Sequence, residues 1–496
     1  MNKTMPYLPY IGAIVGLMAF LFLSPRIKVF IAFFVMTSCF DLVPSLVFNK
    51  NVWDFGAVLL AIAWVQLLLS KPKISPRTTS YVALIQVFIG WMVVCVLWSL
   101  LFYNYPLLNT LKACRQMIIG FLSFFVFQRL FRNDPDSFDF FMKALYWTTY
   151  ALLPVSLLGY LVNKPLLFGL QTEYGGVIRS LPVFLPIGLM HFWIITSRLL
   201  SAEKVRAHEL LYVGMVIGVT ALTFTRGIYL TVMFVFCVML VTLTSRKKLN
   251  FAAATSFMTI GVVLAVVLVL GGYANRVVER FNSAVDLVSG GKRAVSERND
   301  DTYTGRIALA KERVALVAQH NPFVGYGFIH EDDVPDALRS KLKYGSVVYT
   351  PEYVDLYRMG YPYMLALHSA DIGWADIVID TGIFGLILWI LFFAFFVREY
   401  YYTARRTQKL LYYAQLGLFL QTLVGALLMF ESNTFVSLVQ IASFMLAGCW
   451  YCSQGRVWND VKNSQSDGRP MPGRSFGRVI SIPQRAGTSG RIQPAV

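Results

Sequence analysis

The chain has few of the charged residues that cover the surface of a soluble protein. Only 14% of its 496 residues are charged and 56% are hydrophobic, whereas about a quarter of the residues in soluble proteins are charged. The mean hydropathy is +0.58. This composition excludes an ordinary cytosolic enzyme and indicates a membrane protein.

Acidic residues are scarce relative to basic ones. The chain has 27 Asp and Glu against 44 Lys and Arg, which gives a formal net charge of +17. In a soluble protein this excess would suggest a nucleic-acid partner, but in a membrane protein it belongs in cytoplasmic loops. We therefore expect no nucleic-acid partner.

Cysteine is rare, and the patterns of several familiar sites are missing. All six Cys lie in apolar stretches, so no disulfide framework is indicated. The C-x-x-C of Cys449 and Cys452 is interpreted as i, i+3 spacing in a membrane helix. There is no Walker loop, no Rossmann glycine pattern and no metal triad, and His320 and His330 have no partner at ligand spacing. We expect neither a metal nor a cofactor.

Long apolar stretches supply the length that membrane spans need. A helix of about 20 residues crosses the hydrocarbon core, and about 12–13 stretches qualify. We therefore predict an all-α polytopic membrane protein. The first stretch has no small-x-small cleavage site and is expected to be retained as a membrane anchor. The candidate spans are residues 7–23, 27–48, 53–70, 80–103, 107–131, 139–162, 180–200, 208–224, 227–245, 250–271, 372–397, 410–430 and 433–452.

Basic residues occupy alternate connections between these spans. Connections such as 246–248 and 398–409 carry Arg and Lys, whereas 49–52 and 431–433 carry almost none. Because positive charge marks the cytoplasmic side, we expect a periplasmic N-terminus and a cytoplasmic C-terminus. The chain then divides into a bundle of about ten helices at 1–271, a partly helical periplasmic loop at 272–371 between the tenth and eleventh helices, C-terminal helices at 372–452 and a disordered cytoplasmic tail at 453–496.

Two arginines are candidates for binding an anion on the predicted outer side. Ionisable residues at the rim of membrane helices are costly and mark functional sites. Arg226 lies in an apolar run, at the junction of two predicted helices. Arg306 lies near the start of an amphipathic helix predicted for 304–320, and Arg313 is expected on the solvated face of that helix. The plainer interpretations are a snorkelling arginine and an ordinary basic helix face.

His368 is the candidate for proton transfer. It lies just before the last long hydrophobic run, on the predicted outer side. Helical spacing would put Asp371 one turn further on and Asp376 about two turns further on, where acidic groups can orient the imidazole. A hydrogen-bonded structural histidine is the plainer interpretation. Together, two arginines and one histidine suggest a site for a phosphate-bearing group.

These segments, taken in order, resemble the O-antigen ligase and polymerase superfamily of bacterial membrane glycosyltransferases. The resemblance rests on TFTRG at 223–227, on TGR and NPFVGYG within 304–327, and on LHSADIGWADIVIDTGIFGL at 367–386, and it covers about residues 208–400. The chain departs from residues common in the family at three positions, which leaves its branch open. They are Thr225, Ser369 and Asp380, where Ser, Asn and Glu are frequent.

The resemblance implies a GT-C-like fold and a reaction on undecaprenyl-diphosphate-linked glycan at the periplasmic face of the bacterial inner membrane. An acceptor hydroxyl would attack the anomeric carbon, and the diphosphate would leave, with inversion and without a metal. Arg226 and Arg306 would hold the diphosphate, His368 would act as base, and Asp371 would support it. The implied partners are the glycan donor, a glycan or lipid-core acceptor, the lipid bilayer and a chain-length regulator.

Several functions remain open at this stage. A polymerase of O-antigen, capsule or exopolysaccharide repeats is favoured over a ligase that modifies lipopolysaccharide or protein. From other classes, a transporter of lipid-linked glycan or anions and a scaffolding component of the envelope are the alternatives. The transporter is disfavoured because the sequence shows no inverted repeat and few charges in the centres of the helices.

Overall fold

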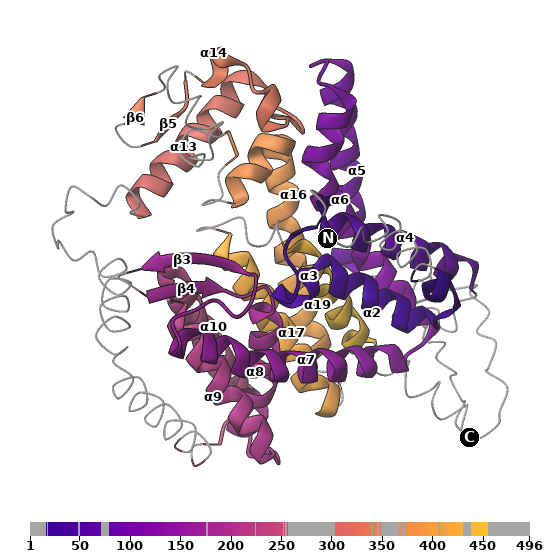
Figure 1. The fold of residues 1–496 in the computed structure, drawn as a ribbon, viewed down its shortest axis with the longest axis vertical. Helices are drawn as coiled ribbons and strands as arrows, with labels where there is room; N and C mark the ends of the chain where they lie inside the picture. Colours follow the sequence, from indigo (N-terminus) through magenta and orange to yellow (C-terminus); the bar gives the residue numbers. More distant parts are fainter. Residues whose placement is uncertain are drawn as a thin grey trace, which may run out of the picture. The chain divides into compact units, whose positions relative to one another are not determined.

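Helices make up most of the described part of the chain (Figure 1). The chain divides into two units, Met1–Gly455 and Arg456–Val496, and every described residue belongs to the first. The computed structural model describes residues 16, 18–47, 50–70, 79–174, 177–223, 225–250, 252, 255, 303–339, 341–344, 347–348, 367–368, 373–404, 407, 409–429 and 438–454.

Seven of the described helices are long and apolar enough to cross a membrane, and three shorter apolar helices accompany them. The prediction of an all-α polytopic membrane protein is therefore confirmed. Most residues of the candidate spans 250–271 and 7–23 lie outside the described residues. The seven are α4 (Val52–Leu69), α5 (Ser80–Leu101), α6 (Leu107–Asn133), α7 (Asp136–Leu161), α10 (Arg226–Ser245), α16 (Gly373–Ala404) and α17 (Lys409–Leu428), and the shorter three are α8 (Leu185–Leu200), α9 (Ala207–Leu222) and α19 (Val439–Ser453).

The outer faces of these helices are apolar, as a membrane requires. On α4, Val58 and Val65 are both 59% exposed, and Leu69 is 83% exposed. A helix that is hydrophobic all round is stable only in a large core or in lipid. Since these side chains face away from the protein interior, the surrounding bilayer is what buries them.

One predicted span, 27–48, is wrong. The helix α2 (Pro25–Met36) has only 12 residues, and the short turn α3 (Ser38–Asp41) follows with positive φ angles between 49° and 67°. The carboxylate of Asp41 is buried and accepts a hydrogen bond of 2.7 Å from the backbone N–H of Val183. The long helix that the apolar run predicted thus ends at Met36, and the chain continues as the hairpin β1 (Leu46–Val47) and β2 (Lys50–Asn51).

The predicted span 180–200 begins too early. Its first residues belong to an antiparallel hairpin of β3 (Leu170–Tyr174) and β4 (Val177–Leu181). Helix α8 starts only at Leu185, with Pro186 in its first turn, where the missing N–H of proline costs nothing.

The segment between the tenth and eleventh predicted spans contains a helix, α13 (Tyr303–His320), that lies against α16 (Figure 1). The predicted apolar stripe is correct where side chains are described, because Ala310 and Val317 are buried. Val317 packs in a cluster with Ile329, Leu367 and Ile379. The shorter elements of this segment are the 3-10 turn η1 (Glu331–Asp333), α14 (Asp336–Arg339), β5 (Lys343–Tyr344) and β6 (Val347–Val348).

Candidate active site

His368 lies between two carboxylates that come from different parts of the chain. Its Nδ1 atom is 2.8 Å from Oε1 of Glu331, and its Nε2 atom is 2.7 Å from Oδ1 of Asp380. Glu331 belongs to η1, and Asp380 is the eighth residue of α16. We call Glu331, His368 and Asp380 the His368 cluster. The imidazole remains 24% exposed, so a substrate group can reach it.

The His368 cluster stabilises the protonated form of His368 and the ionised form of Glu331. Burial alone would lower the pKa of His368, but the charge and hydrogen bond of Asp380, followed by those of Glu331, raise it well above 6.5. Burial likewise opposes ionisation of Glu331, but the hydrogen bonds and charge of His368, and the backbone N–H of Leu367, hold its pKa below the usual value. An imidazolium has an N–H on both ring nitrogens, so the protonated form of His368 matches contacts to two carboxylates.

A break in α16 lies two residues after Asp380. Gly382 interrupts the helix with φ 70° and ψ −177°, a conformation that is essentially restricted to glycine. The loop 321–327 docks into this break through two backbone hydrogen bonds. The N–H of Tyr326 donates to the carbonyl of Ile379 at 2.9 Å, and the N–H of Ile383 donates to the carbonyl of Pro322 at 2.8 Å.

Close backbone approach explains the glycines of this loop. Gly325 and Gly327 have φ angles of 71° and 67°. A Cβ atom on Gly325 would collide with the carbonyl of Ile379, and one on Gly382 would collide with the carbonyl of Phe323. Glycine at these positions therefore lets the two motifs of the resemblance, 321–327 and 367–386, form one structural unit.

The C-terminal half of α5 contacts the same unit. The hydroxyl of Tyr103, just beyond α5, donates to the carbonyl of Gly325 at 2.9 Å, and the Oγ of Ser99 accepts from the N–H of Phe328 at 2.9 Å. The indole N–H of Trp91 donates to the carbonyl of Thr381 at 2.9 Å, next to the helix break. A membrane span thus supports the loop that leads into Glu331.

Arg313 is not on a solvated face, so that prediction is wrong. Its residue surface is only 1% exposed, and its Nε donates to the carbonyl of Leu367 at 3.0 Å. Burial lowers its pKa from the usual value, while the charges of Glu312, Glu331 and Asp376 act in the opposite direction. Arg313 therefore fixes the backbone immediately before His368. Its position, three residues after Ala310 and four before Val317, already put it on the apolar stripe.

The other predicted residues are placed only in part. Arg226 is the first residue of α10 and Arg306 the fourth of α13, and their side chains, like all of Asp371, lie outside the described residues. His368 lies in a bend rather than in a helix, and its described acidic partner in α16 is Asp380 rather than Asp376. Within the described ranges, no group of three His, Cys, Asp or Glu side chains is arranged to bind a metal.

Glu331 is the residue that the sequence reasoning missed. It lies 37 residues before His368, and nothing in the local pattern links the two. The only available signal was the acidic run Glu331, Asp332 and Asp333 shortly after the glycine loop. Glu331 and His368 come close because the loop 321–327 docks into α16. This tertiary contact cannot be read from the order of residues in the sequence.

Comparison with known proteins agrees with the resemblance. Residues 211–390 match the model of the O-antigen ligase family. The match begins in α9, includes all three motifs and the whole His368 cluster, and ends within α16. None of the curated proteins compared with the chain matches it. Residues 211–390 thus match an O-antigen ligase domain, and the predicted resemblance to the O-antigen ligase and polymerase superfamily is confirmed over these residues.

Proposed function

We propose that the protein is a membrane glycosyltransferase that transfers or polymerises glycan from an undecaprenyl-diphosphate carrier, with His368 as its general base. The observation that carries the proposal is the His368 cluster, which lies within the O-antigen ligase domain and beside the start of a membrane span. A partly exposed, oriented imidazole next to the bilayer suits a hydroxyl acceptor and a lipid-bound donor.

The proton steps follow from the geometry of the cluster. Neutral His368 would keep its Nδ1 proton, donate a hydrogen bond from Nδ1–H to Glu331 and present the Nε2 lone pair to the acceptor hydroxyl. As the hydroxyl oxygen bonds to the anomeric carbon, its proton passes to Nε2, and the bond to the diphosphate oxygen breaks. The resulting imidazolium is stabilised by Glu331 and Asp380, in the arrangement of hydrogen bonds that the structure has. The proton then leaves to solvent or with the diphosphate.

The leaving diphosphate requires positive charge, and we assign that role to Arg226 and Arg306. A guanidinium binds two phosphate oxygens at once, whereas an ammonium is a point charge. We expect Arg226→Lys and Arg306→Lys each to lose most transfer activity while the proteins still insert and fold. Near wild-type activity in both variants would remove the assignment. Lys311→Gln, which changes an exposed cation on α13, is the control.

A polymerase of O-antigen, capsule or exopolysaccharide repeats is the favoured form of this activity. The test uses purified protein in nanodiscs with a lipid-linked oligosaccharide donor and no ATP. A ladder of products supports a polymerase, and a single transfer to a lipid-core or protein acceptor supports a ligase. Movement of the donor between leaflets without transfer would reject the enzyme and support a transporter.

The proposed reaction takes place on the periplasmic face. The basic connections 246–248 and 398–409 favour the cytoplasmic side, which puts the described residues 303–339, 341–344 and 367–368 on the periplasmic side and the C-terminus in the cytoplasm. Because α2 is too short to be the span 27–48, the same alternation no longer favours a periplasmic N-terminus. A reporter that is active only in the periplasm should be active when fused after residue 330 and inactive when fused after residue 405. The opposite result at both positions would overturn the orientation.

A further inference from the structure

The loop 321–327 lies beside a membrane span, and two contacts with α5 fix its level. The Oγ of Ser99 accepts from the first N–H after the loop at 2.9 Å, and the indole of Trp91 donates to Thr381, beside the break into which the loop docks. Ser99 and Trp91 are two and ten residues before Leu101, where α5 ends. At about 1.5 Å per residue, these contacts lie about 3 Å and about 15 Å along the axis of the span. The loop is therefore level with the C-terminal half of α5.

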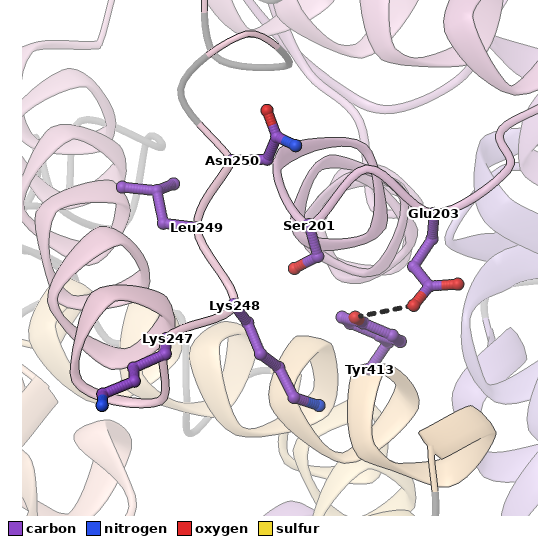
Figure 2. Close-up of a pocket in the computed structure, with 7 residues that line it drawn as sticks. All are labelled: Ser201, Glu203, Lys247, Lys248, Leu249, Asn250 and Tyr413. Atoms are coloured by element: carbon purple, nitrogen blue, oxygen red, sulfur yellow. Dashed lines mark hydrogen bonds between the residues drawn. The ribbon is translucent and has the colours of Figure 1, made fainter.

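The cytoplasmic end of α16 is far along the helix from this loop. Lys248, which follows α10, lines a polar pocket together with Tyr413 of α17 (Figure 2), and lysines at the ends of spans mark the cytoplasmic side. α16 ends nearby, because the carbonyl of Ala404 accepts from Arg246 at 2.8 Å. The break at Gly382 is only the tenth residue of this 32-residue helix. The loop therefore docks into the half of α16 that lies towards the periplasmic side.

Protein groups satisfy the backbone of the loop. The N–H groups of Phe323 and Val324 donate to Oδ1 of Asn321 at 3.1 and 3.2 Å, and the N–H of Gly325 donates to the carbonyl of Asn321 at 2.8 Å. The two docking bonds with α16 and the hydroxyl of Tyr103 satisfy further groups of the loop. Irregular backbone at membrane depth is tolerated only where protein groups replace water in this way. The loop thus meets the condition for lying within the bilayer.

Phe323 gives the loop an exposed aromatic residue. It is 68% exposed, although its carbonyl lies directly against Gly382. Just past the break, Phe384 and Ile387 are also exposed, three residues apart on one face of a candidate membrane span. Leu101, at the end of the neighbouring span α5, is exposed as well. Phe323 therefore continues the apolar surface that these two spans present to lipid.

We propose that the loop 321–327 is a re-entrant segment, which enters the outer leaflet and returns to the periplasmic side, with Phe323 in contact with lipid acyl chains. Transfer of apolar surface from water to hydrocarbon is favourable, so the acyl chains stabilise this position of the ring. The bilayer thereby helps to hold the loop in the break of α16, and the approach of Glu331 to His368 depends on that docking.

Photocrosslinking of the full chain in phosphatidylcholine liposomes tests the proposal. Benzoylphenylalanine in place of Phe323 keeps an aromatic ring and, on irradiation, forms a bond to a nearby C–H carbon, which acyl chains supply. We expect a phospholipid adduct in the mass spectrum, with a yield similar to that from the same label at Leu101. The label at Asp332, whose side chain is 71% exposed in η1, is the control and should give almost no lipid adduct.

A charged substitution tests the same surface through stability. Phe323→Asp should lower the melting temperature in nanodiscs, because a charged side chain is costly in hydrocarbon. In water, an aspartate at so exposed a position would be tolerated. Ala315→Asp, at an exposed position of α13, is the control and should melt like wild type.

Absence of a lipid adduct at position 323 when Leu101 gives one, or an unchanged melting temperature of Phe323→Asp, would overturn the proposal. A crosslinked dimer in place of the lipid adduct would assign Phe323 to an interface between two copies of the chain, and would also contradict it. Both measurements are made without glycan donor, so their results are independent of the proposed glycosyl transfer.

Discussion

Glu331 holds His368 at two points with a single oxygen. Its Oε1 accepts from the backbone N–H of His368 at 2.7 Å and lies 2.8 Å from the imidazole Nδ1, while Oε2 accepts from the N–H of Leu367 at 3.2 Å. One carboxylate therefore fixes both the backbone and the ring of the proposed base. The Nε2 edge of the ring is thereby turned towards Asp380.

Replacing Glu331 should impair transfer without abolishing folding. Glu331→Gln keeps the size of the side chain but removes the charge that stabilises the imidazolium. We expect transfer to fall about 10²-fold, as for other small losses of catalytic geometry. The adjacent Asp332, whose side chain is 71% exposed, supplies the control. If Glu331→Gln transfers glycan as well as Asp332→Asn, Glu331 does not position the base.

Replacing Asp380 should move the pH dependence of transfer. His368 is a base only when neutral, so activity rises as the pH increases through its pKa. Asp380 raises that pKa, and Asp380→Asn should therefore shift the acid limb of the profile to lower pH and reduce the maximal rate. Asp54→Asn, which disrupts a distant ion pair with Arg115, is the control. A lower rate with an unshifted limb would indicate a purely structural role.

The raised pKa of His368 also predicts how the stability of the folded protein changes with pH. The raised pKa of His368 means that its ion pairs contribute fully below pH about 6.5, the pKa of the unfolded state. This contribution is lost as the pH rises through the pKa in the folded protein. Melting temperature should fall more steeply with rising pH in wild type than in His368→Gln, whereas parallel curves would contradict the pairing.

Arg313 should prove structurally important. Arg313→Ala leaves the carbonyl of Leu367 without its donor, and an unsatisfied buried acceptor costs about 1–3 kcal/mol. We expect a lower melting temperature in detergent and a large loss of transfer. Exposed Lys311 on the same helix is the matched position. Should Arg313→Ala and Lys311→Ala melt at the same temperature, the burial of Arg313 has no energetic consequence.

Gly382 should tolerate no side chain. Gly382→Ala would force a Cβ against the carbonyl of Phe323 in a backbone conformation that costs about 1–3 kcal/mol for other residues. We expect the loop 321–327 to detach from α16 and transfer to fall more than tenfold. Gly90→Ala on α5, where no atom lies within 4 Å of the new Cβ, should be neutral. Full activity in Gly382→Ala would show that docking of the loop is dispensable.

The sequence predicted the parts of the fold that depend on local pattern. Apolar length located α4 to α7, and 3.6-residue periodicity located α13. Local pattern did not locate the turn at 38–41. Its four consecutive residues have positive φ angles, yet none is a glycine that would have marked the turn in the sequence. The spacing of Arg313 from Ala310 and Val317 already indicated that it lies on the buried face of α13. Its charge led instead to the prediction of a solvated side chain.

Of the His368 cluster, only His368 itself could be predicted as a site residue from the sequence. His368 was found because it is a histidine at a membrane rim beside acidic residues. Asp380 was among those residues, but its contact could not be read from helical spacing, because His368 lies in a bend outside α16. Glu331 reaches His368 only through the docked loop, since the two are far apart in sequence.

The most direct test of the account is glycan transfer by His368→Ala. A general base contributes about 10²–10⁴-fold, so in membranes of a strain that lacks the native gene this variant should form almost no glycan ladder at wild-type expression. Binding of the lipid-linked donor should be less affected. His320→Ala and His330→Ala, which change histidines outside the His368 cluster, should form nearly normal ladders. A full ladder from His368→Ala would contradict the proposed mechanism.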